Sequence, residues 1–255
     1  MEVKPPERKS VVEVTVIGCW GAYPKKNEAT SGYLVEIGGT KILLDCGSGV
    51  LSRLQNHCSL EELDAVVITH THADHTADLY SLEFAILILT QIGKRARPLD
   101  VYVYCGNPDT LAFGFPDYVR VHPIRIGEPV AIGTARLEFS ENVHDVPCCA
   151  VRLITETGKT FVYSGDTGYC QAMIDISKSA DVLLIESSFY DWQKGRMDGH
   201  LTAGEAGKIA ALAGARQMVL THFPHYGDLE QLVQEASRQY DGLIRLACCD
   251  MKIRI

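Results

Sequence analysis

The chain has 255 residues and a formal net charge of −8, and its 46% hydrophobic and 22% charged residues are ordinary for a globular protein. An acidic chain argues against a broad basic face of the kind that grips long nucleic acid by its phosphates. No apolar run approaches the roughly 20 residues that cross a bilayer. The first nine residues are not followed by the apolar run of a secretory signal. If the chain is full length, we therefore expect a cytoplasmic protein that makes no membrane contact.

The cysteines fit a reducing compartment. There are nine, an odd number, and no C-x-x-C pair that would indicate a structural zinc finger. Two pairs are adjacent in sequence, at positions 148–149 and 248–249, which is a poor geometry for bridging to one another. We expect free thiols.

The N-terminal half is predicted to consist of strands and helices in alternating groups. The predicted strands are 11–17, a hairpin of 32–37 and 41–44 around Gly38-Gly39, 65–69 and 100–104. The predicted helices are 47–54 and 77–92, with a helical turn at 108–113. Between 119 and 139, alternation and turn residues predict two or three antiparallel strands.

The C-terminal half continues in the same way. Strands are predicted at 150–154 and 160–163 as a hairpin, and at 181–186, 217–221, 243–246 and 252–255. Helices are predicted at 168–177, 202–213 and 229–240, the second with Thr202 and Glu205 as a capping box. Since no linker divides the chain, we expect one α/β domain over residues 1–255. Two groups of strands separated by helices predict two sheets packed face to face, with helices outside.

A cluster of metal-ligating residue types directly follows a predicted buried strand. His70, His72, Asp74 and His75 lie within six residues. His70 and His72 point the same way on an extended chain, and a turn after them would let Asp74 and His75 face a second point nearby. Imidazole and carboxylate groups are zinc ligands. The spacing therefore predicts two metal ions side by side.

Further candidates lie elsewhere in the chain. His144 follows a predicted strand region, and Asp166 and His222 each come just after an apolar strand, where they are poor choices unless they have a role. Polar residues at strand ends are where α/β proteins tend to place function. Asp45 also follows a strand, and it either bonds a ligand histidine or caps the next helix.

This pattern resembles the metallo-β-lactamase superfamily from Gly18 to His222. The resemblance implies a four-layer αββα sandwich with a two-metal site between the ends of the sheets. It implies that one metal is held by His70, His72 and His144, the other by Asp74, His75 and His222, and that Asp166 bridges them. A hydroxide between the metals would then be the nucleophile, because bound metal lowers the pKa of water. Asp74 could also orient it.

Residues 199–206 (GHLTAGEA) and 219–223 (VLTHF) resemble the ribonuclease Z branch of that superfamily. That branch has a histidine near the scissile phosphate, which implies a role for His200 as a proton donor to the leaving oxygen, or in stabilising charge on the phosphoryl group. Glu205 either orients His200 or only caps its helix. His225 is a candidate substrate contact, and Trp20 and Tyr23 either frame the pocket or only pack in their loop.

The chain departs from the enzymes that process transfer RNA. Only 21 residues separate His144 from Asp166, which leaves no room for the transfer-RNA-binding arm, and Leu201 stands where the branch commonly has serine. We therefore expect a phosphodiesterase acting on small or cyclic phosphodiesters or on short RNA. The alternatives are a lactone, thioester or ester hydrolase on the same metal site, 3′ processing of transfer RNA, and a metal-stabilised binding protein.

The resemblance also bears on cofactor and assembly. Histidine-rich ligation favours two Zn²⁺ ions, while the carboxylates tolerate manganese or iron. Members of the branch are often homodimers, so a homodimer is a further expectation.

Overall fold

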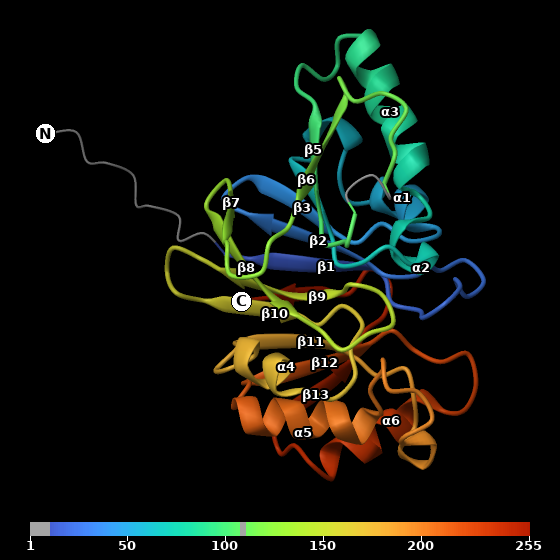
Figure 1. The fold of residues 1–255 in the computed structure, drawn as a ribbon, viewed down its shortest axis with the longest axis vertical. Helices are drawn as coiled ribbons and strands as arrows, with labels where there is room; N and C mark the ends of the chain where they lie inside the picture. The colour runs from blue at the N-terminus through green and yellow to red at the C-terminus, as the bar shows by residue number, and fades with distance from the viewer. Residues whose placement is uncertain (1–10, 108–110) are drawn as a thin grey trace, which may run out of the picture.

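The computed structural model describes residues 11–107 and 111–255 and contains two β-sheets packed face to face, with helices outside (Figure 1). The first sheet has the order β14 (Lys252–Arg254), β1 (Glu13–Gly18), β2 (Gly32–Ile37), β3 (Thr40–Leu44), β4 (Ala65–Ile68), β5 (Leu99–Val103), β6 (Val119–Pro123). The second has the order β13 (Leu243–Leu246), β12 (Gln217–Thr221), β11 (Val182–Glu186), β10 (Thr160–Tyr163), β9 (Cys149–Ile154), β8 (Ala135–Glu141), β7 (Val130–Ile132). This is the four-layer sandwich that the sequence predicts.

Helices form the two outer layers. On the side of the first sheet they are α1 (Val50–Leu54), α2 (Ala73–Thr76) and α3 (Leu79–Gln91), with a 3-10 turn at Leu60–Glu62. On the side of the second sheet they are α4 (Gln171–Ile176), α5 (Ala203–Ala213) and α6 (Leu229–Ser237), with a 3-10 turn at Asp191–Gln193. The helical turn expected at 108–113 falls partly on residues 108–110, which lie outside the described residues.

The core follows from strands that are buried on both faces. All four residues of β4 are buried, and Val67 packs between the two sheets while Val66 packs on the helix side. All of β11 is buried as well. Continuous apolar runs of this kind are typical of parallel strands covered on both sides. The parallel pairs β3–β4 and β10–β11–β12 place the carboxyl ends of these strands at one edge of each sheet, and the functional side chains follow those ends.

Two predicted features need correction. The strands between 119 and 139 do not form one antiparallel group, because β6 pairs in parallel with β5 in the first sheet, while β7 and β8 form a hairpin in the second. The alternation of side chains fixes the period of a strand but not its partner. The helix predicted at 77–92 is preceded by the separate turn α2, so the cluster from Ala73 to His75 is itself helical.

The helix α5 is as predicted. The Oγ1 atom of Thr202 accepts a hydrogen bond from the Glu205 amide, the Glu205 carboxylate accepts one from the Thr202 amide, and Gly214 ends the helix at a φ of 63°. A left-handed residue at this position is most easily a glycine.

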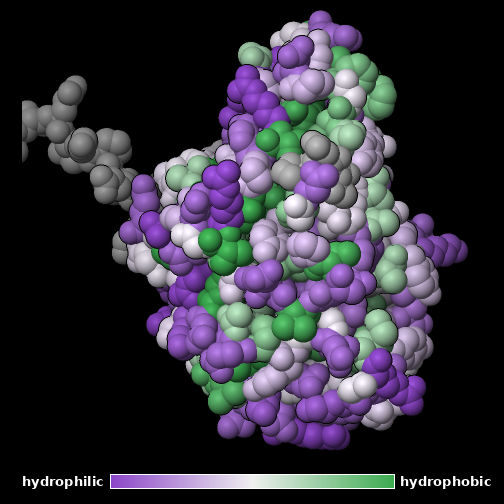
Figure 2. All heavy atoms as spheres, viewed as in Figure 1, coloured by the Kyte–Doolittle hydropathy of each residue, from purple (hydrophilic) through white to green (hydrophobic). Residues whose placement is uncertain are grey.

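The surface seen in Figure 2 mixes hydrophilic and hydrophobic side chains. The apolar side chains exposed on α3 and just after it recur at every fourth residue: Tyr80, Phe84, Ile88 and Ile92. The longest helix, α3, has 13 residues, and within the described part of the chain no helix combines the length and hydrophobicity that crossing a membrane requires.

Candidate active site

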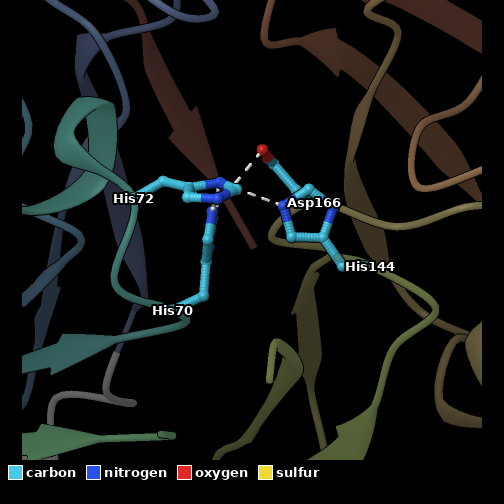
Figure 3. Close-up of side chains that lie close together, drawn as sticks. All are labelled: His70, His72, His144 and Asp166. Atoms are coloured by element: carbon cyan, nitrogen blue, oxygen red, sulfur yellow. Dashed lines mark hydrogen bonds and ion pairs between the residues drawn. The ribbon is translucent and has the colours of Figure 1, made fainter. Parts of the chain in front are cut away.

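The first group of predicted ligands converges on one point. His70 Nε2 lies 3.2 Å from His72 Nδ1, and His144 Nε2 lies 3.1 Å from the same nitrogen. Figure 3 shows these rings and the Asp166 carboxylate pointing toward one another. His70 and His72 follow β4 of the first sheet, whereas His144 and Asp166 follow β8 and β10 of the second. The group therefore spans the two sheets.

The second group lies beside the first. His222 Nε2 is 3.1 Å from Asp74 Oδ2, and His75 Nε2 is 3.7 Å from the same oxygen. Asp74 and His75 come from α2, and His222 directly follows β12. One ligand atom from each of these residues and from Asp166 lies within 4.8 Å of the others.

Asp166 lies between the two groups. Its Oδ2 is 3.7 Å from His70 Nε2 and 3.3 Å from His222 Nε2, while its Oδ1 is 3.4 Å from His75 Nε2. The side chain is 2% exposed. The carboxylate thus faces both groups, as the predicted bridging role requires.

The donor set fits divalent metal ions. Among the described residues, His75 Nε2 and Asp166 Oδ1 are buried polar atoms without a hydrogen-bond partner. Buried polar atoms are normally paired, so an unpaired nitrogen and carboxylate oxygen that face each other indicate a missing ligand. Imidazole nitrogens and carboxylate oxygens are the donors expected for zinc, with manganese or iron as alternatives.

Asp45 supports a residue of each group through the ring nitrogen that faces away from the site. Asp45 is fully buried, and it accepts hydrogen bonds from His75 Nδ1 at 2.7 Å, from the Tyr163 hydroxyl at 2.7 Å and from the amide and hydroxyl of Thr69. The Thr69 hydroxyl in turn lies 3.1 Å from His70 Nδ1. Because Asp45 is acceptor-only, Thr69 donates to it and accepts from His70. Of the two alternatives for Asp45, the structure shows the contact with a predicted ligand, His75. The residue before α1 is Gly49.

Glu186, at the end of β11, supports His222 and His200 in the way that Asp45 supports His70 and His75. It is fully buried and accepts a hydrogen bond from the Ser188 hydroxyl at 2.5 Å and from His200 Nδ1 at 3.0 Å. The Ser188 hydroxyl lies 2.8 Å from His222 Nδ1. Ser188 therefore donates to Glu186 and accepts from His222, which leaves His222 Nε2 free to face the site.

His200 lies directly against the two groups of ligands. Its ring stacks on His222 with 5.6 Å between centroids and packs edge-on against His144 at 5.0 Å. Burial lowers the pKa of His200, but the Glu186 carboxylate outweighs it and raises the pKa to about 9. Glu186 thus holds Nδ1 and favours the imidazolium form.

Glu205 and His225 were also predicted to belong to the site. The Glu205 carboxylate belongs to the capping box and lies 3.1 Å from Lys194 Nζ, so the residue that bonds His200 is Glu186. His225 is stacked against Tyr23 with 3.6 Å between ring centroids and against Trp20 at 4.9 Å. Its Nε2 lies 2.7 Å from the Tyr23 carbonyl oxygen.

Buried carboxylates dominate the electrostatics. Burial alone lowers the pKa of His75, but the Asp166 and Asp45 carboxylates outweigh it and hold this pKa well above the usual range. Burial raises the pKa of Asp166, but His222 and His75 outweigh it and hold this pKa well below normal. Burial and the neighbouring His75 hold the pKa of His70 well below normal. Asp45 and Asp166 are buried carboxylates, and divalent ions bound between the two groups would offset their charge.

The backbone is strained at two of these positions. Asp45 and His222 have φ values of 56° and 55°, a region that non-glycine residues seldom adopt. Such conformations cost of order 1–3 kcal/mol each and cluster at functional sites. Here they aim one supporting carboxylate and one ligand into the site.

A pocket of about 320 Å³ opens beside His200 and His222. Its walls are mostly apolar and are formed by three loops: Gly21, Ala22, Tyr23, Ser188, Phe189, Met197, Phe223, Pro224, His225, Tyr226. A second hollow that His200 also lines is bordered by His72, His144, Asp145 and Arg196 among others. His200 and Met197 border both.

The sequence interpretation missed Glu186 and Ser188. The signal that would have identified Glu186 is the one that identified Asp166 and His222, since Glu186 is the ionisable residue that closes the apolar run of β11. Ser188 carries no such signal, because its role depends on a contact with His222, 34 residues away.

Comparison with known proteins gives the family and the fold. Residues 40–223 match the beta-lactamase superfamily domain. The chain is 39% identical over 237 residues to the probable metallo-hydrolase YhfI of Bacillus subtilis, covering 92% of this chain and 97% of that protein. The crystal structure of YhfI superimposes with a TM-score of 0.90 over 96% of this chain and 100% of that one, at 35% identity.

Ribonuclease Z proteins are more distant relatives. Ribonuclease Z of Methanopyrus kandleri is 28% identical over 264 residues, covering 89% of this chain and 92% of that protein. The short form of human tRNase Z has the same fold, with a TM-score of 0.73 at 22% identity over 94% of this chain and 98% of that one.

Proposed function

The chain belongs to the metallo-β-lactamase superfamily, and on that premise we propose that it is a two-metal phosphodiesterase acting on small or cyclic phosphodiesters or on short RNA. The observation that carries the proposal is His200, which lies against both groups of ligands and is held by a buried glutamate. A carboxylic ester or thioester has a better leaving group than an alkyl phosphodiester and less need of such a proton donor.

We propose that the metal ligands divide as the resemblance implies. His70, His72 and His144 would hold one ion, Asp74, His75 and His222 the other, and Asp166 both. Divalent ions bound there would polarise a phosphoryl oxygen and lower the pKa of a water molecule. The Asp74 carboxylate is additionally fixed by the Ala22 amide, which donates to its Oδ2 at 2.8 Å.

His200 is the group that moves a proton. Glu186 accepts a hydrogen bond from its Nδ1, so Nε2 is the nitrogen from which a proton can pass to the substrate. As the bond between phosphorus and the leaving oxygen breaks, that oxygen takes the proton and departs as an alcohol. The neutral imidazole that remains is recharged from solvent through the open pockets that His200 borders.

The two hollows support a compact substrate. The apolar pocket of about 320 Å³ would take one substituent of a phosphodiester, and the more polar hollow the other. The apolar pocket has the size and lining of a site for a small molecule. Between His144 and Asp166 the chain forms only the β9–β10 hairpin, which favours small substrates over a folded transfer RNA.

The first experiment is hydrolysis of bis(p-nitrophenyl) phosphate by metal-loaded protein and by the His200→Ala variant. We expect the diester rate to fall by roughly 10²–10⁴ in the variant, the usual contribution of general acid catalysis. His122→Ala is the matched control, because this histidine is 41% exposed and bonded to Asp100 away from the site. Turnover of p-nitrophenyl acetate without diester turnover, or full diester activity in His200→Ala, would overturn the assignment.

Transfer-RNA processing is a second candidate, because of the relative named ribonuclease Z. Cleavage of a precursor transfer RNA at its 3′ end, at a rate exceeding that for small diesters, would favour it. The predicted homodimer is a separate matter, which light scattering of the purified protein tests.

A further inference from the structure

A group of thiols lies beside the active-site loop. Cys19 follows β1, and Cys248 and Cys249 lie in the turn between β13 and β14. The sulfur atoms of Cys19 and Cys249 and a Glu28 carboxylate oxygen all lie within 4.8 Å of one another, and Cys249 Sγ is 3.8 Å from Glu28 Oε2. All three cysteines are free thiols. The sulfur atoms must close to about 2.05 Å to form a disulfide.

The two nearest thiols differ in access. Cys19 is 1% exposed, whereas Cys249 is partly exposed. The hydrogen bond with Cys19 lowers the pKa of Cys249, with help from the charge of Arg53 and against the effects of burial and of the Glu28 carboxylate. The same bond, together with burial, raises the pKa of Cys19 well above normal. Because the thiolate is the reactive form, Cys249 is the thiol that an oxidant meets first.

We propose that Cys19 and Cys249 are a peroxide-reactive thiol pair that closes to a reversible disulfide. The Cys249 thiolate attacks one oxygen of hydrogen peroxide, the O–O bond breaks, and a sulfenic acid and hydroxide form. The Cys19 sulfur then attacks the sulfenic sulfur and displaces its hydroxyl group, which leaves as water with the Cys19 proton. The first hydroxide takes up the proton that Cys249 lost. Two thiols and one peroxide thus give one disulfide and two waters.

The pair is connected to the metal ligands through the backbone. The Cys19 carbonyl oxygen accepts a hydrogen bond from the Phe223 amide at 3.1 Å, next to the ligand His222. Three residues after Cys19, the Ala22 amide donates to Asp74. Movement of Cys19 toward Cys249 would therefore pull on the supports of two ligands.

Glu28 provides a second connection. Its Oε2 accepts a hydrogen bond from Trp20 Nε1 at 2.5 Å as well as from the Cys249 thiol. Trp20 stacks on His225, which lines the apolar pocket. A disulfide removes the thiol donor to Glu28, so the pocket wall and the ligands are disturbed together, and hydrolysis falls.

The test uses metal-loaded protein treated with hydrogen peroxide, alkylated with N-ethylmaleimide and digested with trypsin without reduction. We expect a peptide that contains Cys19 to be linked to the peptide that contains Cys248 and Cys249. The Cys248→Ser variant is the matched control, and it retains the link. In Cys249→Ser the link is absent.

Hydrolysis and metal content are measured on the same samples. In the wild type and in Cys248→Ser we expect peroxide to lower the hydrolysis rate about tenfold at unchanged metal content, since small displacements of positioning groups have effects of this size or larger. Dithiothreitol restores the rate, and Cys249→Ser keeps its full rate in peroxide.

Several results would overturn the proposal. These are a bridge between Cys248 and Cys249, loss of activity in Cys249→Ser equal to that in the wild type, or an oxidised protein that is fully active. Metal found at the thiols instead of oxidation would also overturn it. The peptide link does not depend on which substrate the enzyme hydrolyses, so its absence would leave the proposed function untouched.

Discussion

Four of the proposed ligand imidazoles are each held by a protein group on the nitrogen that faces away from the site. The partners are Thr69 for His70, Asp45 for His75, the Gly199 carbonyl for His144 and Ser188 for His222. A proton fixed on the outer nitrogen leaves a lone pair on the inner one. The two buried carboxylates Asp45 and Glu186 thereby set the protonation state of ligands in both metal groups.

Replacing Asp45 tests this arrangement. Asp45→Asn keeps the size of the side chain but removes its charge and replaces one of the two oxygen atoms that accept from Thr69, His75 and Tyr163 with a donor. We expect metal affinity to fall by roughly 10–100-fold, measured by competition with a chromophoric chelator. Asp100→Asn is the control, because Asp100 is 40% exposed and pairs with His122. Equal affinity in the two variants would contradict the supporting role of Asp45.

Glu186 and Glu205 make a matched pair for a second test. Glu186→Gln removes the charge that holds His200, and we expect the diester hydrolysis rate to fall by about 10² or more, within the usual range of general acid catalysis. Glu205→Gln preserves a side chain that can complete the capping box, so its rate should stay near that of the wild type. A larger loss in Glu205→Gln than in Glu186→Gln would show that Glu205 positions His200.

The proposed ligands and the supporting Asp45 stand out in the sequence, whereas Ser188 and Tyr163 do not. His70 to His75 form a local motif, and Asp166 and His222 directly follow apolar strands. Ser188 and Tyr163 have their roles only because the fold brings them to partners 34 and 118 residues away. No local pattern encodes such contacts.

At the scale of elements, two loops approach the proposed ligands closely at glycine residues, which have no side chain. A Cβ atom built on Gly21 would lie 2.8 Å from the His222 ring, and one on Gly47 would lie 1.9 Å from the Asp74 carbonyl oxygen. Contacts this short do not occur, so both loops depend on glycine to approach the site.

Gly21→Ala therefore displaces the His222 ring. We expect weaker metal binding. The ion held by Asp74, His75 and His222 should be lost before the other, since that group is the one disturbed. Metal analysis after dialysis against a weak chelator measures it. Gly114→Ala is the control, because a Cβ there meets nothing within 4 Å. The same metal content in both variants would refute the expected displacement.

Elements defined by local chemistry are the ones that the sequence predicts well. The capping box and terminal glycine of α5 and the Gly38-Gly39 hairpin depend on neighbouring residues only. The parallel pairing of β6 with β5 depends on the whole sheet, and so an alternating pattern could not reveal it.

At the scale of the whole molecule, the site joins the two sheets. His70, His72, Asp74 and His75 follow β4 of the first sheet, whereas His144, Asp166 and His222 follow strands of the second. Bound metal would therefore link the two halves of the sandwich and stabilise the folded state over the unfolded one. The expectation of one domain over residues 1–255 stays a prediction.

Chelation should consequently lower the thermal stability. With free metal at 100 times its dissociation constant, one ion contributes about 2.7 kcal/mol to the free energy of unfolding, so the thermal midpoint should fall by several degrees on adding excess chelator. Differential scanning calorimetry of Asp166→Asn is the control, since a variant with a weakened site should respond less. A wild-type thermal midpoint that does not change when chelator is added would contradict metal bound between the sheets.

The most direct test of the two-metal hydrolase is to titrate metal-free protein with Zn²⁺ while following hydrolysis of bis(p-nitrophenyl) phosphate. The rate should rise until about two ions are bound per chain and then level off, as expected of a two-metal site. Full activity with one ion per chain, or diester hydrolysis that persists without metal, would contradict the account.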